Sequence, residues 1–221
     1  MANNKNAKRG NFYWENGQPY ISVTQALQCL DKPALRYWYG MQVYRYFVNN
    51  SDASEREALA APWSVSGTAK NRGTTVHSIV ESWQHTGTVK TDIPEAYKGY
   101  ATAFNDWVNE YNAELVEHES SVVNHVEKYA GTLDLRVKIA NTTAIIDVKT
   151  GKDIYPESGL QLSAYKHCDN VQADRIGVVL LQENGTYKFQ WQPDEYEAFL
   201  HVKAVWEWVN QDLLKSVNYY Q

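Results

Sequence analysis

Apolar and polar residues follow a strand-like pattern through the second half of the chain. Three apolar segments are predicted to be β-strands: residues 113–123, 128–139 and 143–149. The polar, turn-prone segment 141–143 joins the last two, so residues 131–149 are predicted to form a β-hairpin. A second hairpin is predicted around the turn dipeptide Asn184-Gly185, with strands at 175–182 and 186–192.

Helical periodicity dominates the first half of the chain and its end. Segment 94–111 is a clear example, because its apolar residues recur at helical spacing along one side. Pro33 is expected to begin a helix and Pro62 to end one. The predicted helices are 24–30, 33–46, 53–61, 70–84, 94–111, 158–168 and 195–217.

These elements predict an α/β protein with a mixed central β-sheet flanked by helices and an α-helical N-terminal region. A length of 221 residues fits a single domain. Residues 1–19 are interpreted as a flexible basic N-terminal arm. The remaining residues, 20–221, are expected to form one domain with a helical part, a core and a closing helix: 20–111, 112–192 and 193–221.

Composition narrows the classes of function. No apolar run approaches the length of a membrane span and the first ten residues carry no apolar signal segment, so a cytoplasmic protein without a membrane partner is expected. No GxxxxGK[ST] pattern is present, so no nucleotide cofactor is expected. The formal charge of −5 still allows nucleic-acid binding, because a metal site concentrates carboxylates and the local distribution of charge decides.

Aromatic residues are abundant, with 8 Trp, 16 Tyr and 5 Phe. Base stacking on such rings holds single strands without regard to sequence, although most of these rings are expected in the core. The predicted helix 33–46 is aromatic on all sides at residues 36–39, so some of its rings must be exposed or contact a partner.

The hairpin 131–149 carries the candidate chemistry. Asp134 lies in its first apolar strand, and its second strand ends in Asp147-Val148-Lys149. Asp147 and Lys149 share one face of that strand, and pairing of the two strands can bring Asp134 close to Asp147. Two carboxylates suit a hard divalent metal such as Mg²⁺ or Mn²⁺, and phosphodiester hydrolysis needs such a metal with a cation nearby. Taken alone, the pattern also fits a surface hairpin with a cross-strand ion pair.

Further polar residues accompany this hairpin in a fixed order along the chain. They are a histidine preceded by arginine, two glutamates, a segment that follows Lys149, and a glutamine–tyrosine pair on one helix face: Arg72 to His77, Glu81, Glu119, Thr150-Gly151-Lys152, and Gln161 with Tyr165. The ordered set resembles the PD-(D/E)XK nuclease superfamily in its RecB-like branch. It is most similar there to the mitochondrial genome maintenance exonuclease and related phage and bacterial exonucleases. The resemblance covers residues 20–170 and includes Ile21–Thr24 before a helix.

This resemblance implies an α-β-β-β-α-β core with added N-terminal helices that cover the cleft and gate access of DNA. It implies that His77 supplies a metal contact beside Asp134, Asp147 and the main-chain carbonyl of Val148. Lys149 would position or deprotonate the attacking water, or stabilise charge on the phosphate. Some RecB-like nucleases carry a four-cysteine iron–sulfur cluster. The two cysteines of this chain cannot build one, so no iron–sulfur cluster is expected.

A second group of residues is expected to contact DNA or to support the metal ligands: Arg72, Glu81, Glu119, Lys152, Gln161, Tyr165, Ser22 and Thr24. Alternatives stay open for several positions. His77 also fits a hydrogen-bonded core histidine, and Glu119 a solvated strand carboxylate. Tyr165 also fits a buried tyrosine, and Ser22 and Thr24 fit simple helix N-caps.

The sequence thus favours a metal-dependent DNA exonuclease that prefers single-stranded ends, acting in DNA replication, recombination or repair in a bacterial or phage-infected cell. An endonuclease or structure-specific nuclease of the same superfamily, of the CRISPR-adaptation or restriction type, is the first alternative. A non-catalytic DNA-binding module is the second, and the intact Asp134, Asp147 and Lys149 argue against it.

Overall fold

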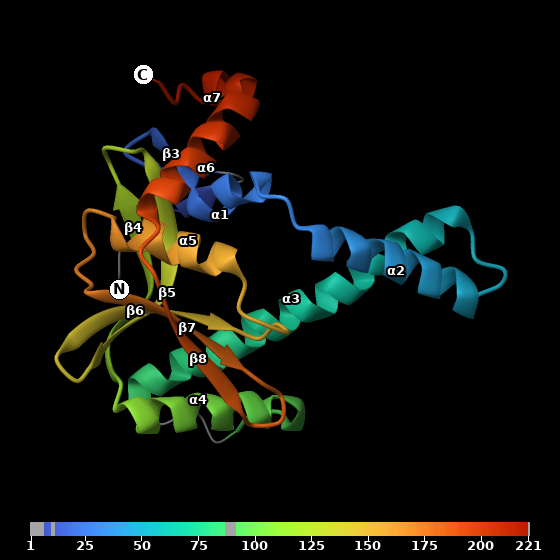
Figure 1. Ribbon diagram of the computed structural model, residues 1–221, viewed down its shortest axis with the longest axis horizontal. Helices are drawn as coiled ribbons and strands as arrows, with labels where there is room; N and C mark the ends of the chain where they lie inside the picture. The colour runs from blue at the N-terminus through green and yellow to red at the C-terminus, as the bar shows by residue number, and fades with distance from the viewer. Residues whose placement is uncertain (1–6, 10–11, 87–91, 221) are drawn as a thin grey trace.

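The computed structural model describes residues 7–9, 12–86 and 92–220, which form one mixed β-sheet between two layers of helices (Figure 1). The described strands are β1 (Ala7–Arg9), β2 (Phe12–Glu15), β3 (Gln18–Ser22), β4 (Glu114–Asn124), β5 (Tyr129–Ile139), β6 (Thr142–Lys149), β7 (Arg175–Leu181) and β8 (Tyr187–Gln192). They follow the order β1-β2-β3-β5-β6-β7-β8, and β4 pairs with β5.

The helices of the described chain are α1 (Val23–Ala26), α2 (Pro33–Asn49), α3 (Glu55–Thr86), α4 (Lys98–Tyr111), α5 (Pro156–Lys166), α6 (Tyr196–Val209) and α7 (Gln211–Ser216), with short 3₁₀ turns η1 (Leu27–Cys29) and η2 (Glu95–Tyr97). From α4 to β7 the order is α-β-β-β-α-β. The predicted fold class, a mixed sheet flanked by helices with a helical N-terminal region, is therefore confirmed.

One edge of strand β5 has two different partner strands, and the sheet branches there. β4 lies antiparallel along one edge of β5. On the opposite edge, β3 runs parallel beside Tyr129 and Ala130, whereas β6 runs antiparallel beside residues 135–139. Between these two partners, residues 131–134 are left without a paired residue of another described strand on that edge. The candidate site lies at this division of the sheet.

Two apolar cores cover the two faces of the sheet. One packs against α1, α5 and α6, and the other against α3 and α4. Along β6, Ile145 belongs to the first core, while Ile146 and Val148 belong to the second. Because side chains alternate in a strand, Asp147 and Lys149 share the face of Ile145, on the α5 side.

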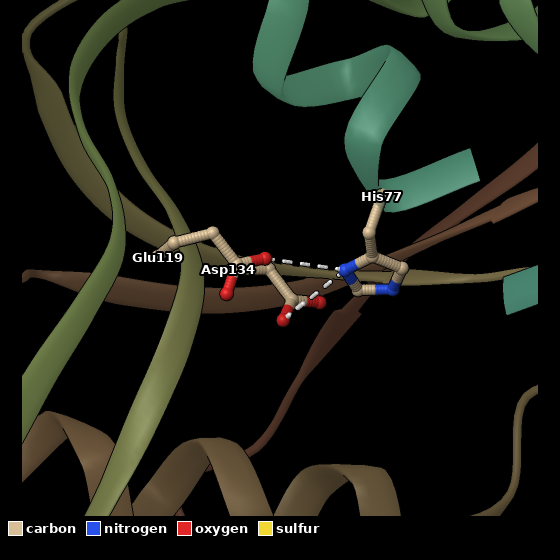
Figure 2. A group of neighbouring side chains, drawn as sticks. All are labelled: His77, Glu119 and Asp134. Carbon is tan, nitrogen blue, oxygen red and sulfur yellow. Dashed lines mark hydrogen bonds and ion pairs between the residues drawn. The ribbon is translucent and has the colours of Figure 1, made fainter. Parts of the chain in front are cut away.

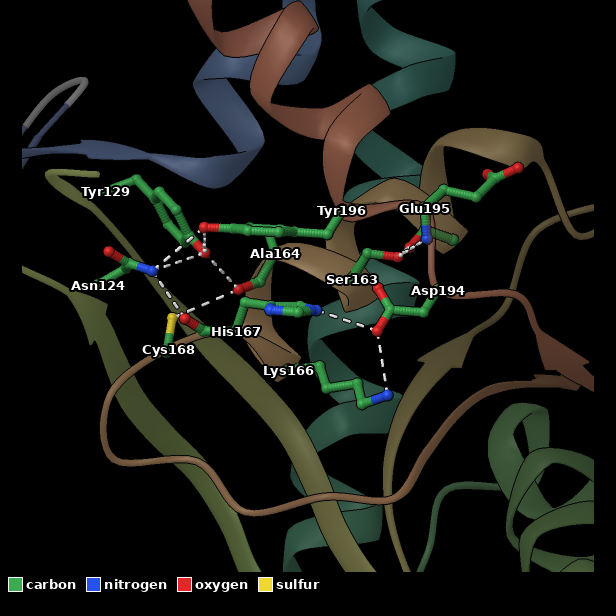
Figure 3. Close-up of polar contacts among 11 residues, drawn as sticks. Asn124, Tyr129, Ser163, Ala164, Lys166, His167, Cys168, Asp194, Glu195 and Tyr196 are labelled. Carbon is green, nitrogen blue, oxygen red and sulfur yellow. Dashed lines mark hydrogen bonds and ion pairs between the residues drawn. The ribbon is translucent and has the colours of Figure 1, made fainter. Parts of the chain in front are cut away.

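Helix α5 is tied to the sheet and to α6 by buried polar contacts (Figure 3). The Tyr129 hydroxyl donates a hydrogen bond of 2.9 Å to the Ala164 carbonyl, and the Asn124 amide donates one of 2.7 Å to the His167 carbonyl. The His167 ring stacks on Tyr196 of α6 at 3.9 Å between centroids. These contacts fix α5, which carries Gln161 and Tyr165, over the face that holds Asp147.

The N-terminal helices form a hairpin that projects sideways from the sheet (Figure 1). The prediction that a helix stops at Pro62 is wrong, because α3 continues through Pro62 as a helix of 32 residues. Proline removes one helical hydrogen bond without forbidding the helical φ angle. Packing of α2 against α3, with Tyr39 and Trp63 rings 5.6 Å apart, stabilises the helix directly after the proline.

The first residues also differ from expectation. A flexible arm over residues 1–19 is wrong for residues 12–19, which lie in the antiparallel hairpin of β2 and β3. Most of the apolar side chains of this hairpin are buried, with Phe12 in the core beneath α6. Residues 1–6, including Lys5 of the expected basic arm, lie outside the described residues.

The closing helix is present but divided at Asn210 into α6 and α7. Tyr219 follows α7, and its hydroxyl donates to Glu207 of α6 at 2.9 Å, which folds the chain end back on α6. Within the described ranges, no helix is both long enough and apolar enough to cross a membrane.

Candidate metal centre

Three neighbouring strands each bring one carboxylate to the same level of the sheet. Leu135 of β5 pairs with Ile146 of β6, so the next positions toward the opening are Asp134 and Asp147. On the other edge, His118 and Ser120 of β4 pair with Leu135 and Leu133, which places Glu119 opposite Asp134. The resulting order across the sheet is Glu119, Asp134, Asp147. The prediction that hairpin pairing brings Asp134 and Asp147 together agrees with this register.

The backbone of Glu119 is unusual. Its φ angle is 42°, in the left-handed region that a residue with a side chain seldom adopts. The register of β4 also shifts by one residue between Leu115 and Glu117, which marks a β-bulge just before it. Bulges re-aim side chains, and strained backbone concentrates at functional sites. The strain at Glu119 therefore supports a functional role for its carboxylate.

Helix α3 contributes His77 to the row of carboxylates (Figure 2). The Nδ1 atom of His77 lies 3.4 Å from Glu119 Oε1 and 3.7 Å from Asp134 Oδ1. Its Nε2 atom lies 3.1 Å from the main-chain carbonyl oxygen of Val148. Both ring nitrogens therefore face acceptors, which is the environment of a protonated imidazole.

Electrostatics at the site favour a bound cation. Burial alone lowers the pKa of His77, but the hydrogen bond with Glu119 and the charges of Asp134, Glu119 and Asp147 outweigh it and raise the pKa to about 9. Burial, followed by the charge of Asp147, raises the pKa of Asp134. The carboxylates thus create a strongly negative site that holds an extra proton on His77.

Asp147 and Lys149 form a buried pair beside this group. Asp147 is only 2% exposed, and the Lys149 ammonium lies 2.8 Å from its Oδ1 and 2.8 Å from its Oδ2. Only the contact with Oδ1 has the geometry of a hydrogen bond, and Oδ2 has no hydrogen-bond partner among the described residues. Burial lowers the pKa of Lys149, but the charges of Asp147 and Asp134 raise it more. Lys149 is therefore a charged ammonium at neutral pH, anchored within the site.

His77, Glu119 and Asp134 together can hold a metal ion. One ligand atom from each lies within 4.8 Å of the others. Two carboxylate oxygens and an imidazole nitrogen suit a divalent metal such as Mn²⁺, and carboxylates suit Mg²⁺. The carboxylates that raise the pKa of His77 give this place the negative charge that a divalent cation needs. The residues present thus fit the implied metal.

This group differs from the predicted ligand set in one respect. Glu119, expected to support the ligands, stands beside His77 and Asp134, whereas the Asp147 carboxylate is held by Lys149. The Val148 carbonyl accepts from His77, and the Val148 N–H donates to Asp134 Oδ2 at 2.8 Å. Asp147 and Val148 therefore adjoin the group, and their ligand roles stay predictions.

Tyr165 reaches the site because Gly131 leaves room for it. A Cβ atom at Gly131 would lie 2.2 Å from Tyr165 Cε1, so the tyrosine ring packs directly on the bare backbone of β5. Gln161 donates a hydrogen bond of 3.1 Å to the Tyr165 hydroxyl. The predicted pairing of these two residues on one helix face is thus present, and it faces the opening of the sheet beside Asp134.

Tyr13 of β2 also lies near the site, although its sequence pattern did not mark it as a site residue. Its hydroxyl lies 3.1 Å from the Thr132 hydroxyl, two residues before Asp134, and the charge of Glu119 contributes to the raised pKa of Tyr13 after burial as the main cause. The available signal was the run of three aromatic residues in segment 12–15, because aromatic residues favour strands, followed by the turn dipeptide Asn16-Gly17. Assigning this segment to an arm hid its contact with the site.

The other predicted residues are distributed around the centre. Glu81 lines an open pocket of about 460 Å³ with His77, Glu119 and small residues of α3: Gly73, Thr74 and Ser78. Lys152 is exposed in the loop after β6. Arg72 is half-buried and faces α4, where its charge acts on Tyr100.

Ser22 and Thr24 lie at the start of α1, away from this pocket. Ser22 is 1% exposed, and its hydroxyl lies 2.9 Å from that of Thr24. The Ser22 side chain makes no capping hydrogen bond to α1. Ser22 is buried whereas Thr24 is exposed, and phosphate binding by these two hydroxyls stays a prediction.

Comparison with known proteins gives distant structural similarity only. No protein-family model and no curated protein matches the sequence. The structure of SSO0001 aligns with a TM-score of 0.44 and 14% identity over 92% of this chain and 78% of that one. An alkaline exonuclease, LHK-Exo from Laribacter hongkongensis, aligns with a TM-score of 0.42 and 13% identity over 90% of this chain and 94% of that one. The same enzyme in complex with dAMP gives a TM-score of 0.36 and 12% identity, covering 89% and 94%.

Proposed function

We propose that this protein is a metal-dependent deoxyribonuclease, an exonuclease that hydrolyses phosphodiester bonds from single-stranded DNA ends. The observation that carries the proposal is the convergence of His77, Glu119 and Asp134 beside the buried Asp147–Lys149 pair. A role in DNA replication, recombination or repair, in the cytoplasm of a bacterial or phage-infected cell, is part of the same proposal.

The residues of the centre have different roles in the proposed reaction. A Mg²⁺ or Mn²⁺ ion held by His77, Glu119 and Asp134 would supply a Lewis acid for the charge on the scissile phosphate. Lys149, held by Asp147, presents an ammonium at the same place and orients the attacking water or stabilises the charge of the transition state. Gln161 and Tyr165, on the α5 side, are positioned to contact the DNA backbone.

The test is digestion of single-stranded DNA labelled at the 5′ or the 3′ end, with Mg²⁺, with Mn²⁺ and with EDTA. We expect metal-dependent release of nucleotides by the wild type and none by Asp147→Asn. Asp153→Asn is the matched control, because Asp153 is an exposed carboxylate of a surface ion pair with Lys188. Cleavage that persists in EDTA, or that Asp147→Asn retains, contradicts the proposal.

An endonuclease is the second candidate, and the position of α2 favours it. The N-terminal helices are expected to cover the cleft, and α3 does line the pocket, but among the described residues that line it none belongs to α2. A site that α2 does not cover can admit an internal segment of a strand. Closed circular single-stranded DNA separates the two candidates, because an exonuclease leaves it intact and an endonuclease linearises it.

A further inference from the structure

We propose that α2 and residues 55–70 of α3, together called the arm, form a second binding surface for single-stranded DNA. The arm projects from the body of the protein (Figure 1). This inference deepens the proposed nuclease function, on which it rests for the identity of the strand as substrate.

The arm exposes aromatic rings that nothing in the described structure covers. Helix α2 has 17 residues and none of them is buried. Tyr37 is 72% exposed, Tyr44 is 63% exposed, and Trp63 of α3 is 67% exposed. Large exposed apolar side chains gathered on one part of a surface mark an interaction site. The arm is therefore a surface that binds a partner.

Charge identifies the kind of partner. The arm carries four basic residues, Arg36, Arg45, Arg56 and Lys70, and two acidic ones, Glu55 and Glu57, so its net charge is +2. Arg36 is paired with Asp31 just before α2, and the chain as a whole has a formal charge of −5. A second copy of the arm would bring the same positive charge, whereas a polyanion is complementary. Flat exposed rings among basic side chains bind unpaired bases by stacking and phosphates by charge.

The arm is continuous with the metal centre. Trp63 and His77 belong to the same helix, 14 positions apart, which corresponds to about 21 Å of helix rise. Between them the helix carries Lys70, and the pocket begins at Gly73 and Thr74. A strand bound by its bases on the arm can thus follow α3 to the carboxylates.

The experiment measures binding and cleavage separately. Binding of a fluorescent oligo(dT) is followed by anisotropy in EDTA, which prevents metal-dependent cleavage. We expect Trp63→Ala, and Tyr37→Ala with Tyr44→Ala, to weaken binding about tenfold each. Arg45→Glu, at an exposed position, should weaken binding and lower its salt dependence. Trp208→Ala is the matched control, since Trp208 is 72% exposed but lies on α6.

Cleavage of a small substrate, thymidine 5′-(p-nitrophenyl phosphate), distinguishes this inference from the nuclease function. Arm variants should cleave it like the wild type while losing activity on long strands. If the wild type binds oligo(dT) through the arm but cleaves neither substrate, the nuclease proposal fails and the arm surface stands.

Three results would overturn the arm surface. One is oligo(dT) binding by the arm variants equal to that of Trp208→Ala, with melting temperatures showing that all variants are folded. Another is sedimentation showing a wild-type dimer that the arm variants convert to monomers, because a second copy then covers the arm. The third is equal competition by poly-glutamate or by single-stranded RNA.

Discussion

At the scale of single residues, the metal centre depends on charged groups that are buried away from water. Asp147 is almost completely buried, and it is retained because Lys149 lies against both of its oxygens. His77 keeps a proton because three carboxylates surround it. Buried charges of this kind destabilise the folded protein when no metal ion is bound. Functional centres often carry such unfavourable charges.

Lys149→Ala should abolish cleavage without unfolding the protein or preventing metal binding, because the ammonium is not a metal ligand. Loss of a charge near the scissile phosphate should lower kcat roughly 10²–10³-fold. The measurement is single-turnover cleavage, with Mn²⁺ binding followed by calorimetry. Lys138→Ala, an exposed lysine on β5, is the control and should retain activity. Turnover of Lys149→Ala near that of the control would contradict the role of Lys149.

The metal-free protein should lose stability as the pH rises from about 6.5 to about 9. The pKa of His77 is raised from 6.5 when unfolded to about 9 in the fold, so its proton stabilises the fold fully below the lower value and no longer above the higher one. Melting temperatures across this range in EDTA measure the effect. His77→Gln should flatten the decline, and an unchanged decline in this variant would show that another group causes it.

At the scale of elements, two packing contacts place the site: α5 on β5 through Gly131, and α3 across the end of β6. The first contact depends on the lack of a side chain at Gly131, because the Tyr165 ring occupies the space that a Cβ atom would fill. The second brings Gly73 of α3 close to Thr150, with an added Cβ 4.0 Å from the threonine Oγ1. Only Gly131 is needed for such an approach, because a Cβ atom at Gly73 would make an ordinary van der Waals contact.

Gly131→Ala should therefore destabilise the fold and impair the site. The added methyl group collides with a buried ring at 2.2 Å, and such overpacking costs about 1–3 kcal/mol. Denaturant unfolding measures the free energy, and cleavage should fall with it because Tyr165 is displaced. Gly67→Ala is the control, since an added Cβ there meets nothing within 4 Å and alanine favours a helix. Equal stability of Gly131→Ala and wild type would show that Tyr165 packs elsewhere.

At the scale of the whole molecule, folding gathers one histidine and three carboxylates from four separate elements. Folding thus brings negative charges together at a cost in electrostatic free energy, and a bound divalent cation would reduce that cost. Metal binding and folding should be linked, because the unfolded chain has no such arrangement.

Millimolar Mg²⁺ or Mn²⁺ should raise the melting temperature relative to EDTA. At a hundredfold excess over Kd the stabilisation is about 2.7 kcal/mol, which for a chain of this size is about 5–10 °C. The shift should shrink at low pH, where protons compete for the carboxylates and His77. Asp134→Asn should lose the shift yet be no less stable than wild type in EDTA, because burial disfavours its charge. An equal shift in Asp134→Asn would place the metal elsewhere.

The sequence by itself determined the strands from β4 to β8, most of the helices and the proximity of Asp134 to Asp147. Alternating apolar residues gave β5 and β6 their facing sides, and hairpin pairing then required Asp134 and Asp147 to be neighbours. These predictions succeeded because strand period and turn chemistry are local properties.

Only the tertiary structure decided what depends on contacts between distant segments. It continued α3 through Pro62, added residues 12–22 to the sheet, and turned α2 away from the pocket. It also brought Glu119 next to His77, through a backbone conformation that no local preference favours. Helix ends, edge strands and strained backbone are settled by the packing energy of the whole fold, which a single segment of sequence does not contain.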